Sequence, residues 1–280
     1  MVVKIIIADV DGCFVKEDKT KPPMLEDLTS SVPDLEAIRV FLSQHPNVIL
    51  SFCTTRSLAA GARVAELAGV NGYSSFENGN VVYNPKTGES YVLVEKDPSM
   101  RHLTPVLAKL RDWYKTIDEN ILLDELKISP NQLRRLLDRK SVLTFEILPF
   151  DAPPVSGHDL WEVIQRRFLT PEITDLIEAG KVLVVPSGSA LDIGLNINKG
   201  HAAKHILGLY GISREDALGI GDSYHSDTVL LSQTGYNGVP SNAHPQLKDS
   251  VRVNHLAYVS SEPHGRGVFD ILKHFLEKDN

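Results

Sequence analysis

Short, mostly apolar runs that stop abruptly at polar residues are the feature that most constrains this fold. Residues 2–8, 47–52 and 217–220 form such runs, and each is too short for a typical helix. Continuous apolar runs of this length suit strands that are buried on both faces, as in a parallel sheet. Helical spacing follows the first two runs, and the order strand, helix, strand, helix predicts an α/β fold with a parallel sheet.

The intervening helices carry recognisable start and stop signals. Pro33 opens a helix whose apolar residues recur at helical spacing, and a second helix over residues 58–68 stops at Gly69. A further helix is expected to begin at Lys199, where the first pattern returns.

The middle of the chain changes character after a turn signal at residues 84–88. The pattern predicts strands at residues 142–148, 181–185 and 190–195, a helix that begins at Ser129-Pro130, and a helix from Thr170 to Gly180. The expected domains are therefore a core of residues 1–84 and 192–280 and an inserted α+β unit of residues 85–191.

Composition and charge exclude several classes of protein. The 280 residues are 42% hydrophobic and 23% charged, which is ordinary for a globular protein with a sizeable core. The net charge of −7 argues against a nucleic-acid surface, and no run approaches the roughly 18 apolar residues of a membrane span. The start lacks the features of a signal peptide, so we expect a soluble, cytoplasmic protein.

The two cysteines, Cys13 and Cys53, are too few for a disulfide framework. They flank two polar motifs, which leaves two interpretations open. They are either a redox-sensitive pair near a site or, as is more common, buried inert thiols.

Two acids follow the first expected strand. Asp9 and Asp11 are two residues apart, and this spacing places both side chains on one side of an extended chain. Ligands of open α/β sheets bind outside the carboxyl ends of the strands, where one carboxylate can attack a substrate and another can move protons. Gly12 permits a turn directly afterwards. Taken alone, the two acids fit a solvated turn equally well.

Two more acids, Asp222 and Asp227, follow the expected strand at residues 217–220. Four carboxylates at the ends of one sheet would repel one another unless a cation neutralised them. Mg²⁺ prefers oxygen ligands, and no cluster of His and Cys has zinc-like spacing. We therefore expect a magnesium site, although an ordinary turn would explain Gly221-Asp222 by itself.

Thr54 and Lys199 are candidates for binding an anion. Thr54 follows the second expected strand, where its hydroxyl would either bind phosphate oxygens or cap the next helix. Lys199 lies at a helix start, where the helix dipole disfavours a cation unless a bound anion shares its charge. Without an anion, Lys199 would be an ordinary solvated lysine.

In this order, the motifs resemble those of the haloacid dehalogenase superfamily. They are Asp9-Val10-Asp11-Gly12, Thr54, Asn198-Lys199-Gly200, and Gly221-Asp222 with Asp227. The resemblance implies a Rossmann-like core with an inserted cap of the C2 type, and the mixed α+β character of residues 85–191 resembles its C2B branch. That branch includes Cof-like phosphatases, sucrose-phosphate phosphatase, mannosyl-3-phosphoglycerate phosphatase and phosphomannomutase.

Shorter segments agree with that branch. They are Thr54-Thr55-Arg56-Ser57, Glu77-Asn78-Gly79, Asn242-Ala243 and Gly267-Val268. Cys13 and Thr55 depart from the pattern, because the branch usually has Thr and Gly there, and Asp222 and Asp227 are five residues apart rather than four. The link at residues 16–30 is longer than expected, and we predict that it forms a flap.

The resemblance implies a magnesium-dependent phosphatase that hydrolyses a small-molecule phosphate ester, in relatives with this cap mostly a sugar phosphate. Asp9 would attack phosphorus to form an aspartyl-phosphate, and Asp11 would protonate the leaving alcohol and then activate water. The implied phosphate-binding residues are Thr54, Thr55, Lys199 and Asn242, and the implied metal-site residues are Asp9, Asp11, Asp222 and Asp227. Two alternatives stay open: a phosphomutase of the phosphomannomutase type and a non-catalytic module that binds sugar phosphates.

Cations in the insert are candidates for meeting an anionic leaving group, although helix-surface charge explains most of them. They are Arg101, His102, Arg134, Arg135, Arg166 and Arg167. Residues 187–192 resemble the segment before the motif lysine of sucrose-phosphate phosphatases. Ser189 stands where those proteins usually have Lys, which argues against sucrose phosphate itself.

Overall fold

The structure is a computed structural model that describes residues 2–16, 28–149 and 151–277. Most of the link that we predicted to form a flap, residues 16–30, lies outside the described residues.

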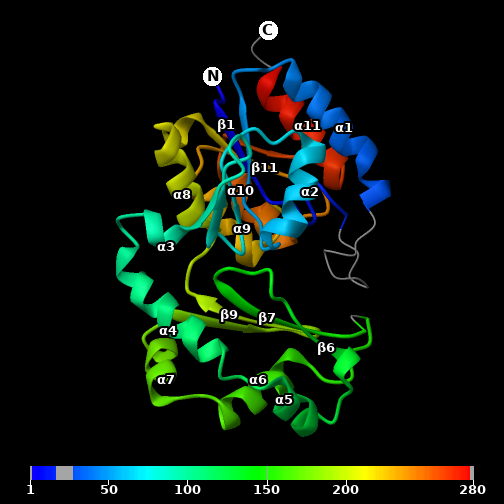
Figure 1. The fold of residues 1–280 in the computed structure, drawn as a ribbon. Coiled ribbons are helices and arrows are strands. Elements are labelled where there is room, and N and C mark those ends of the chain that lie inside the picture. The colour runs from blue at the N-terminus through cyan, green and yellow to red at the C-terminus, as the bar shows by residue number, and fades with distance from the viewer. Residues whose placement is uncertain (1, 17–27, 150, 278–280) are drawn as a thin grey trace. The chain divides into compact units, whose positions relative to one another are not determined.

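The described chain divides into two compact units, whose residues can be followed in Figure 1 by the colour bar. The second unit contains residues 92–197, and the first contains the described residues on either side of it. The expected boundaries were residues 85 and 191. The second boundary lies further on because strand β9, Ala190–Leu195, pairs along its length with two strands of the second unit.

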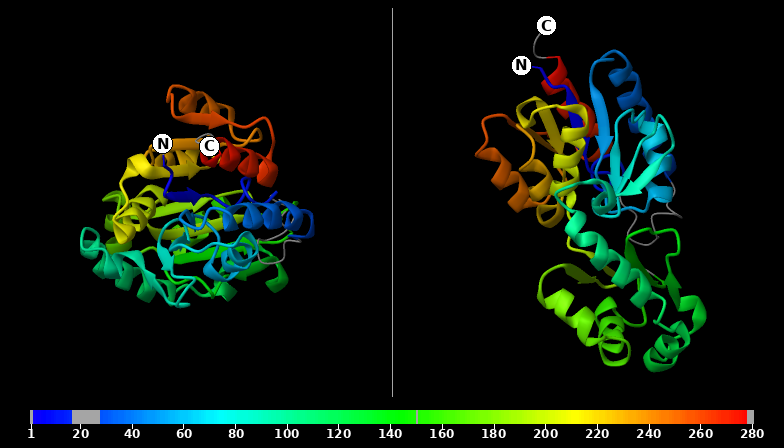
Figure 2. Two further views of the ribbon diagram at one scale, coloured as in Figure 1. Left: turned by 90° about the horizontal axis from the view of Figure 1, so that it is seen from above. Right: turned by 60° about the vertical axis from the view of Figure 1, so that its left-hand side comes forward.

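The first unit is built around a five-stranded parallel sheet, which Figure 2 shows from two further directions. The order of its strands is β12-β11-β10-β1-β2. Its strands are β1 (Ile5–Ala8), β2 (Ile49–Phe52), β10 (Ala217–Ile220), β11 (Tyr236–Val239) and β12 (Ala257–Val259). Strand β1 lies between β10 and β2. This confirms the expected α/β class and the three strands that the short apolar runs predicted.

Helices cover both faces of this sheet. They are α1 (Val32–Ser43), α2 (Leu58–Ala68), α8 (Lys199–Tyr210), α9 (Tyr224–Leu231), α10 (Pro245–Arg252) and α11 (His264–Leu276). Ile6 and Ala8 of β1 lie in a core with residues of α1, α2 and α11, whereas Ile5 and Ile7 lie in a core with α8 and α9. Because both faces are apolar, the polar groups of β1 are confined to its ends.

A smaller sheet follows α2 and consists of β3 (Ser74–Phe76), β4 (Val81–Tyr83) and β5 (Ser90–Val92). The turn between β3 and β4 is Glu77-Asn78-Gly79, and its three residues have φ angles of 52°, 57° and 95°. Left-handed conformations at two successive residues other than glycine are uncommon and need support from their surroundings.

The second unit is a four-stranded antiparallel sheet in the order β6-β7-β9-β8, with helices α4 to α7 on one side of it (Figure 1). Its elements are α3 (Leu93–Lys96), α4 (Thr104–Tyr114), α5 (Glu119–Leu126), β6 (Leu133–Arg135), β7 (Val142–Ile147), α6 (Gly157–Arg167), α7 (Pro171–Glu178), β8 (Val182–Pro186) and β9. The expected helix at Thr170 is confirmed, since its side chain accepts from the N–H of Ile173 as an N-cap.

The helix expected at Ser129-Pro130 is wrong. Ser129 starts a single 3₁₀ turn, Pro130–Gln132, and the chain then enters β6. Leu133 lies opposite Ile147 in the antiparallel pairing with β7. Leu133, Leu136 and Leu137 recur at helical spacing, which favoured a helix. Strand pairing with a separate segment satisfies the backbone here instead and overrides that preference.

None of the helices that the structure describes has the length and apolar character that crossing a bilayer requires.

Candidate active site

The polar ends of three adjacent strands meet at one edge of the parallel sheet. Asp9 follows β1, Thr54 lies two residues beyond β2, and Asp222 lies two residues beyond β10. Ala8, the last residue of β1, lies opposite Phe52 on one side and Ile220 on the other. The sheet register therefore brings together side chains that are far apart in the sequence.

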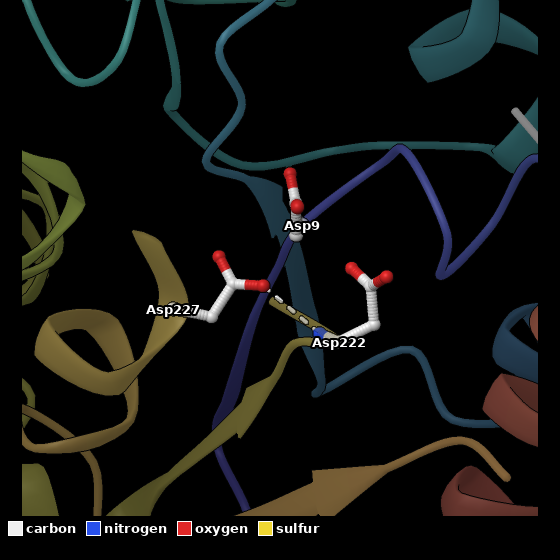
Figure 3. A group of neighbouring side chains, drawn as sticks. All are labelled: Asp9, Asp222 and Asp227. Atoms are coloured by element: carbon white, nitrogen blue, oxygen red, sulfur yellow. Dashed lines mark hydrogen bonds between the residues drawn. The ribbon is translucent and has the colours of Figure 1, made fainter. Parts of the chain in front are cut away.

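Three carboxylates cluster at this edge (Figure 3). One oxygen each from Asp9, Asp222 and Asp227 lies within 4.8 Å of the others, and this is a donor set that could hold a metal ion. Asp9 is 5% exposed and Asp227 is fully buried. The ammonium group of Lys199, the first residue of α8, lies 2.8 Å from Asp9 Oδ2 and 2.7 Å from Asp227 Oδ1.

Asp227 uses both of its oxygens within the protein. Its Oδ2 accepts hydrogen bonds of 2.9 Å from the N–H groups of Asp222 and Ser223. Its Oδ1 accepts from Lys199 and from the hydroxyl of Ser226 at 3.2 Å. Asp227 therefore fixes the loop after β10 and is a counter-charge for Lys199, which leaves Asp9 and Asp222 as the more available carboxylates.

The buried charges of this cluster do not balance, because three carboxylates face one ammonium group. Burial raises the pKa of Asp9 well above its usual range, and Lys199 offsets this only in part. Burial, followed by the charge of Asp227, raises the pKa of Asp222 to about 7. Burial alone would lower the pKa of Lys199, but the charges of Asp227 and Asp9 raise it, so Lys199 stays an ammonium group. A divalent cation would remove the imbalance, and the oxygen donors present fit Mg²⁺.

Asp11 pairs with a different cation. Arg56 Nε donates to both carboxylate oxygens at 3.0 Å, and Nη2 donates to Oδ1 at 2.5 Å. The chain turns tightly after Asp9, because the carbonyl of Val10 accepts from the N–H groups of residues 13–15. The chain is therefore not extended at these two acids, as their spacing had been taken to indicate, and each acid pairs with its own cation. In the sequence, Arg56 stands out only as part of the Thr54-Thr55-Arg56-Ser57 motif.

Of the two interpretations of Thr54, the helix cap is wrong, and the phosphate-binding role stays a prediction. Thr54 is fully buried, and its hydroxyl oxygen accepts from the N–H of Arg56 at 3.2 Å. Ser57, and not Thr54, caps α2. Thr55 is exposed. Since a hydroxyl that accepts a hydrogen bond can also donate one, Thr54 still has its O–H for a ligand.

Asn242 lies against the loop that carries the two acids. Its Nδ2 donates to the carbonyl of Gly12 at 2.8 Å, and its Oδ1 accepts from the N–H of His264 at 2.8 Å. The Nδ1 atom of His264 lies 3.1 Å from the same carbonyl. Gly12 has a φ of +74°, and a Cβ there would lie 2.0 Å from Asp222 Oδ2. The amide of Asn242 thus braces this loop, and its role in phosphate binding stays a prediction.

His264 was missed by the sequence analysis. It has a left-handed φ of 49° at the start of α11, and no local pattern marks a residue whose partner lies 252 positions earlier.

Both cysteines are fully buried and free. Cys13 Sγ lies 3.8 Å from Asp222 Oδ1, and Cys53 Sγ accepts from the hydroxyl of Ser75 at 3.0 Å. Burial raises the pKa of both thiols, that of Cys53 to about 12. Because the thiolate is the reactive form, these surroundings favour inert thiols over a redox pair.

Four of the expected cations of the insert pair within their own unit. Arg134 pairs with Glu146, Arg135 donates to the carbonyl of Tyr114 at 2.9 Å, and Arg166 and Arg167 both pair with Glu125. These four cations therefore serve contacts within the second unit, and such contacts explain their presence without a substrate.

Part of the sequence is similar to that of known hydrolases. A family model of haloacid dehalogenase-like hydrolases matches residues 177–272. A phosphoglycolate phosphatase of Staphylothermus marinus is 34% identical over 130 residues, which is 43% of this chain and 52% of that protein. The chain spans about half the length of the curated relatives it matches.

Solved structures share the whole fold. A Thermoplasma acidophilum protein superposes with a TM-score of 0.62 at 18% identity and covers 98% of this chain and 99% of its own. The sucrose-phosphatase of Synechocystis sp. PCC6803, solved with sucrose and phosphate, has a TM-score of 0.56 at 18% identity and covers 98% of both chains. At such identities these likenesses concern the fold alone.

Proposed function

We propose that the chain is a phosphatase of the haloacid dehalogenase superfamily, and that it uses Asp9 as a nucleophile on a small-molecule phosphate monoester. The family model that matches residues 177–272 and the 34% identity to a phosphoglycolate phosphatase support the proposal. The observation that carries the proposal is the buried cluster at the end of β1. There a carboxylate lies against a buried ammonium group and next to two further carboxylates. So many buried charges of one sign are costly unless they serve a ligand.

The contacts of Asp9 suit a nucleophile. The N–H of Val10 donates to Oδ1 at 2.7 Å, and the ammonium group of Lys199 lies 2.8 Å from Oδ2. Together they fix the plane of the carboxylate and favour its ionised form, which is the form that attacks. Lys199 is also a fixed positive charge for the phosphoryl oxygens as their charge redistributes.

The proposed reaction has two steps. In the first, an oxygen of Asp9 bonds to phosphorus as the bond to the leaving oxygen breaks, and Asp11 gives that oxygen a proton. In the second, Asp11 takes a proton from water, the water oxygen bonds to phosphorus, and the aspartyl-phosphate bond breaks. The products are the alcohol and inorganic phosphate, and both acids return to their starting state.

We propose that Asp9, Asp222 and the backbone carbonyl of Asp11 hold Mg²⁺, with Asp227 behind them. When bound, the ion would neutralise the carboxylates and polarise a phosphoryl oxygen. The imbalance of buried charge described above supports this assignment. We further propose that Thr54, Thr55 and Asn242 contribute to phosphate binding.

The substrate that we propose is a small phosphate ester of an alcohol, with sugar phosphates and phosphoglycolate as the first candidates. The names of the curated relatives support phosphoglycolate. The resemblance of the sequence motifs to the C2B branch, whose members mostly act on sugar phosphates, supports a sugar ester. We propose that residues 92–197 are a cap that recognises the alcohol part.

The test is phosphate release from a panel of sugar phosphates and phosphoglycolate, with Mg²⁺ and with EDTA. We expect release from one or two compounds with Mg²⁺ only, and none from the Asp9→Asn variant. Full activity of that variant would remove the nucleophile assignment. A folded protein that releases no phosphate but is activated by a sugar bisphosphate to move the phosphoryl group would point to a mutase. Tight ligand binding without turnover would point to a binding module.

A further inference from the structure

We infer that Arg56 is a positioning residue for the proposed reaction and holds the carboxylate of Asp11 in the orientation from which it exchanges a proton. The inference rests on the proposed function, and it assigns a role to a side chain that the reaction steps above do not use.

The contact between the two side chains is specific. Arg56 meets Asp11 side-on through Nε and Nη2, and this fork engages both carboxylate oxygens. Paired donors of this kind fix the plane of a carboxylate as well as its position, which a single ammonium group does not do. The side chain of Arg56 is 2% exposed, whereas that of Asp11 is 22% exposed. The fixed partner is therefore Arg56, and the partner that can reach a ligand is Asp11.

The backbone of Arg56 is held as well. Its N–H donates to the hydroxyl of Thr54, and its carbonyl accepts from the N–H of Glu77 at 2.8 Å. The N–H of Asn78 donates to the carbonyl of Thr54 at 3.0 Å. Glu77 and Asn78 are the two left-handed residues of the turn between β3 and β4. Such conformations are strained and persist only where the surrounding structure holds them, and the turn they form supports the segment that carries Arg56.

The other face of this turn is also packed. A Cβ at Gly79 would lie 2.7 Å from the carbonyl oxygen of Asn198, the residue before Lys199. The Glu77-Asn78-Gly79 turn therefore contacts the segment that carries Arg56 on one side and the residue before Lys199 on the other. These two contacts give the motif a physical role.

The expected consequence depends on the leaving group. A general acid contributes about 10²- to 10⁴-fold to such reactions, and a misplacement of about 1 Å costs on the order of 10²-fold. An alkyl leaving group needs the proton from Asp11, whereas a nitrophenolate leaves without one. Loss of Arg56 should therefore slow the first step selectively with the alkyl ester, whereas the attack of water in the second step should slow equally with both esters.

The experiment compares kcat and KM on phosphoglycolate and p-nitrophenyl phosphate for the full chain with Mg²⁺. The variants are Arg56→Lys, which keeps the charge but loses the fork, Arg56→Ala, Asp11→Asn and the double variant Arg56→Ala/Asp11→Asn. Arg63→Ala, an exposed arginine of α2, is the control. If the wild type prefers a sugar phosphate, that ester replaces phosphoglycolate.

We expect both Arg56 variants to lose about 10- to 100-fold in kcat/KM on the alkyl ester, with a smaller loss in kcat/KM on the aryl ester. The ratio kcat/KM is the measure because it reports the steps up to the aspartyl-phosphate and excludes the later attack of water, in which Asp11 takes part with both esters. Added guanidinium ion should restore part of the alkyl-ester activity of Arg56→Ala. In the Asp11→Asn background, removal of Arg56 should cost less than about twofold, because Arg56 acts through Asp11.

Equal losses in kcat/KM on both esters, or additive losses in the double variant, would overturn the inference and leave the phosphatase function intact. A folded wild type that releases phosphate from neither these esters nor the panel would remove the proposed function and the inference with it. If Arg56→Ala does not fold, Arg56→Lys decides the question through the same ratio of alkyl to aryl activity.

Discussion

Replacement of Lys199 with methionine would test how far this ammonium group stabilises the buried carboxylates. Lys199 is 1% exposed and contacts Asp9 and Asp227 at 2.8 and 2.7 Å. Methionine has a similar length, so the change removes the charge without opening a large cavity. Asp227 would keep its two backbone donors, whereas Asp9 would keep the single donor that Val10 provides in the described contacts.

The expected loss of stability is large. Breaking one side of a buried ion pair costs about 3–5 kcal/mol, because an unpaired charge stays buried. For a unit of this size, 1 kcal/mol corresponds to about 2–4 °C in the unfolding midpoint. The Lys199→Met variant should therefore unfold roughly 6–20 °C lower than the wild type in EDTA at about pH 8.

The loss should depend on pH in a definite direction. Burial already raises the pKa of Asp9 above its unfolded value of 3.8, and removal of Lys199 should raise it further. A group with a raised folded pKa binds its proton more tightly when folded, so it destabilises the fold above that pKa and stops doing so as the pH falls. The difference between variant and wild type should shrink between pH 8 and pH 5.

Thermal unfolding followed by circular dichroism, with EDTA at both pH values, measures these differences. Lys204→Met is the matched control, since Lys204 is an exposed lysine of the same helix. It should change stability by less than about 0.5 kcal/mol. The reasoning would be refuted if Lys199→Met matched Lys204→Met, or if its loss were the same at pH 5 and pH 8.

Three further predictions concern the same edge of the sheet. Burial raises the pKa of Asp222 to about 7 from a usual 3.8, so protons should compete with Mg²⁺ for this carboxylate. The affinity of the protein for Mg²⁺ should therefore fall by up to about tenfold per pH unit below pH 7. Equal affinities at pH 8 and pH 6, measured by calorimetry, would contradict this. Gly79→Ala should lower the free energy of unfolding in urea by about 1–3 kcal/mol more than Gly88→Ala does. Both glycines have a positive φ, but a Cβ at Gly88 meets nothing within 4 Å, so equal losses would argue against the contact with Asn198. Asn242→Ala should cost about 0.5–1.5 kcal/mol through lost hydrogen bonds, and no change in midpoint would show that the brace is dispensable.

Much of the core could be predicted from local pattern. The strand at residues 217–220 and the helix at residues 58–68 begin and end where they were predicted. Gly69 ends that helix in a left-handed conformation, as its position suggested. These features depend on residues that are close in the sequence, so local periodicity and end signals are sufficient to find them.

The strand β6 shows where this reasoning stops. The leucine spacing after Ser129 has a helical period, but the segment pairs with β7 instead. A three-residue strand has too little local signal to outweigh such spacing, and the partner that stabilises it is a separate segment of the chain.

The sequence by itself determined the class of the fold. It also predicted a site at the carboxyl ends of the strands, made of four carboxylates and a lysine. Those conclusions depend on residue type and order along the chain. Only the tertiary structure decided how the charges pair: Lys199 with Asp9 and Asp227, and Asp11 with Arg56. Pairing depends on side-chain direction at the ends of neighbouring strands and on the turns that follow them. Contacts far apart in the sequence set both, so local pattern carries no record of them.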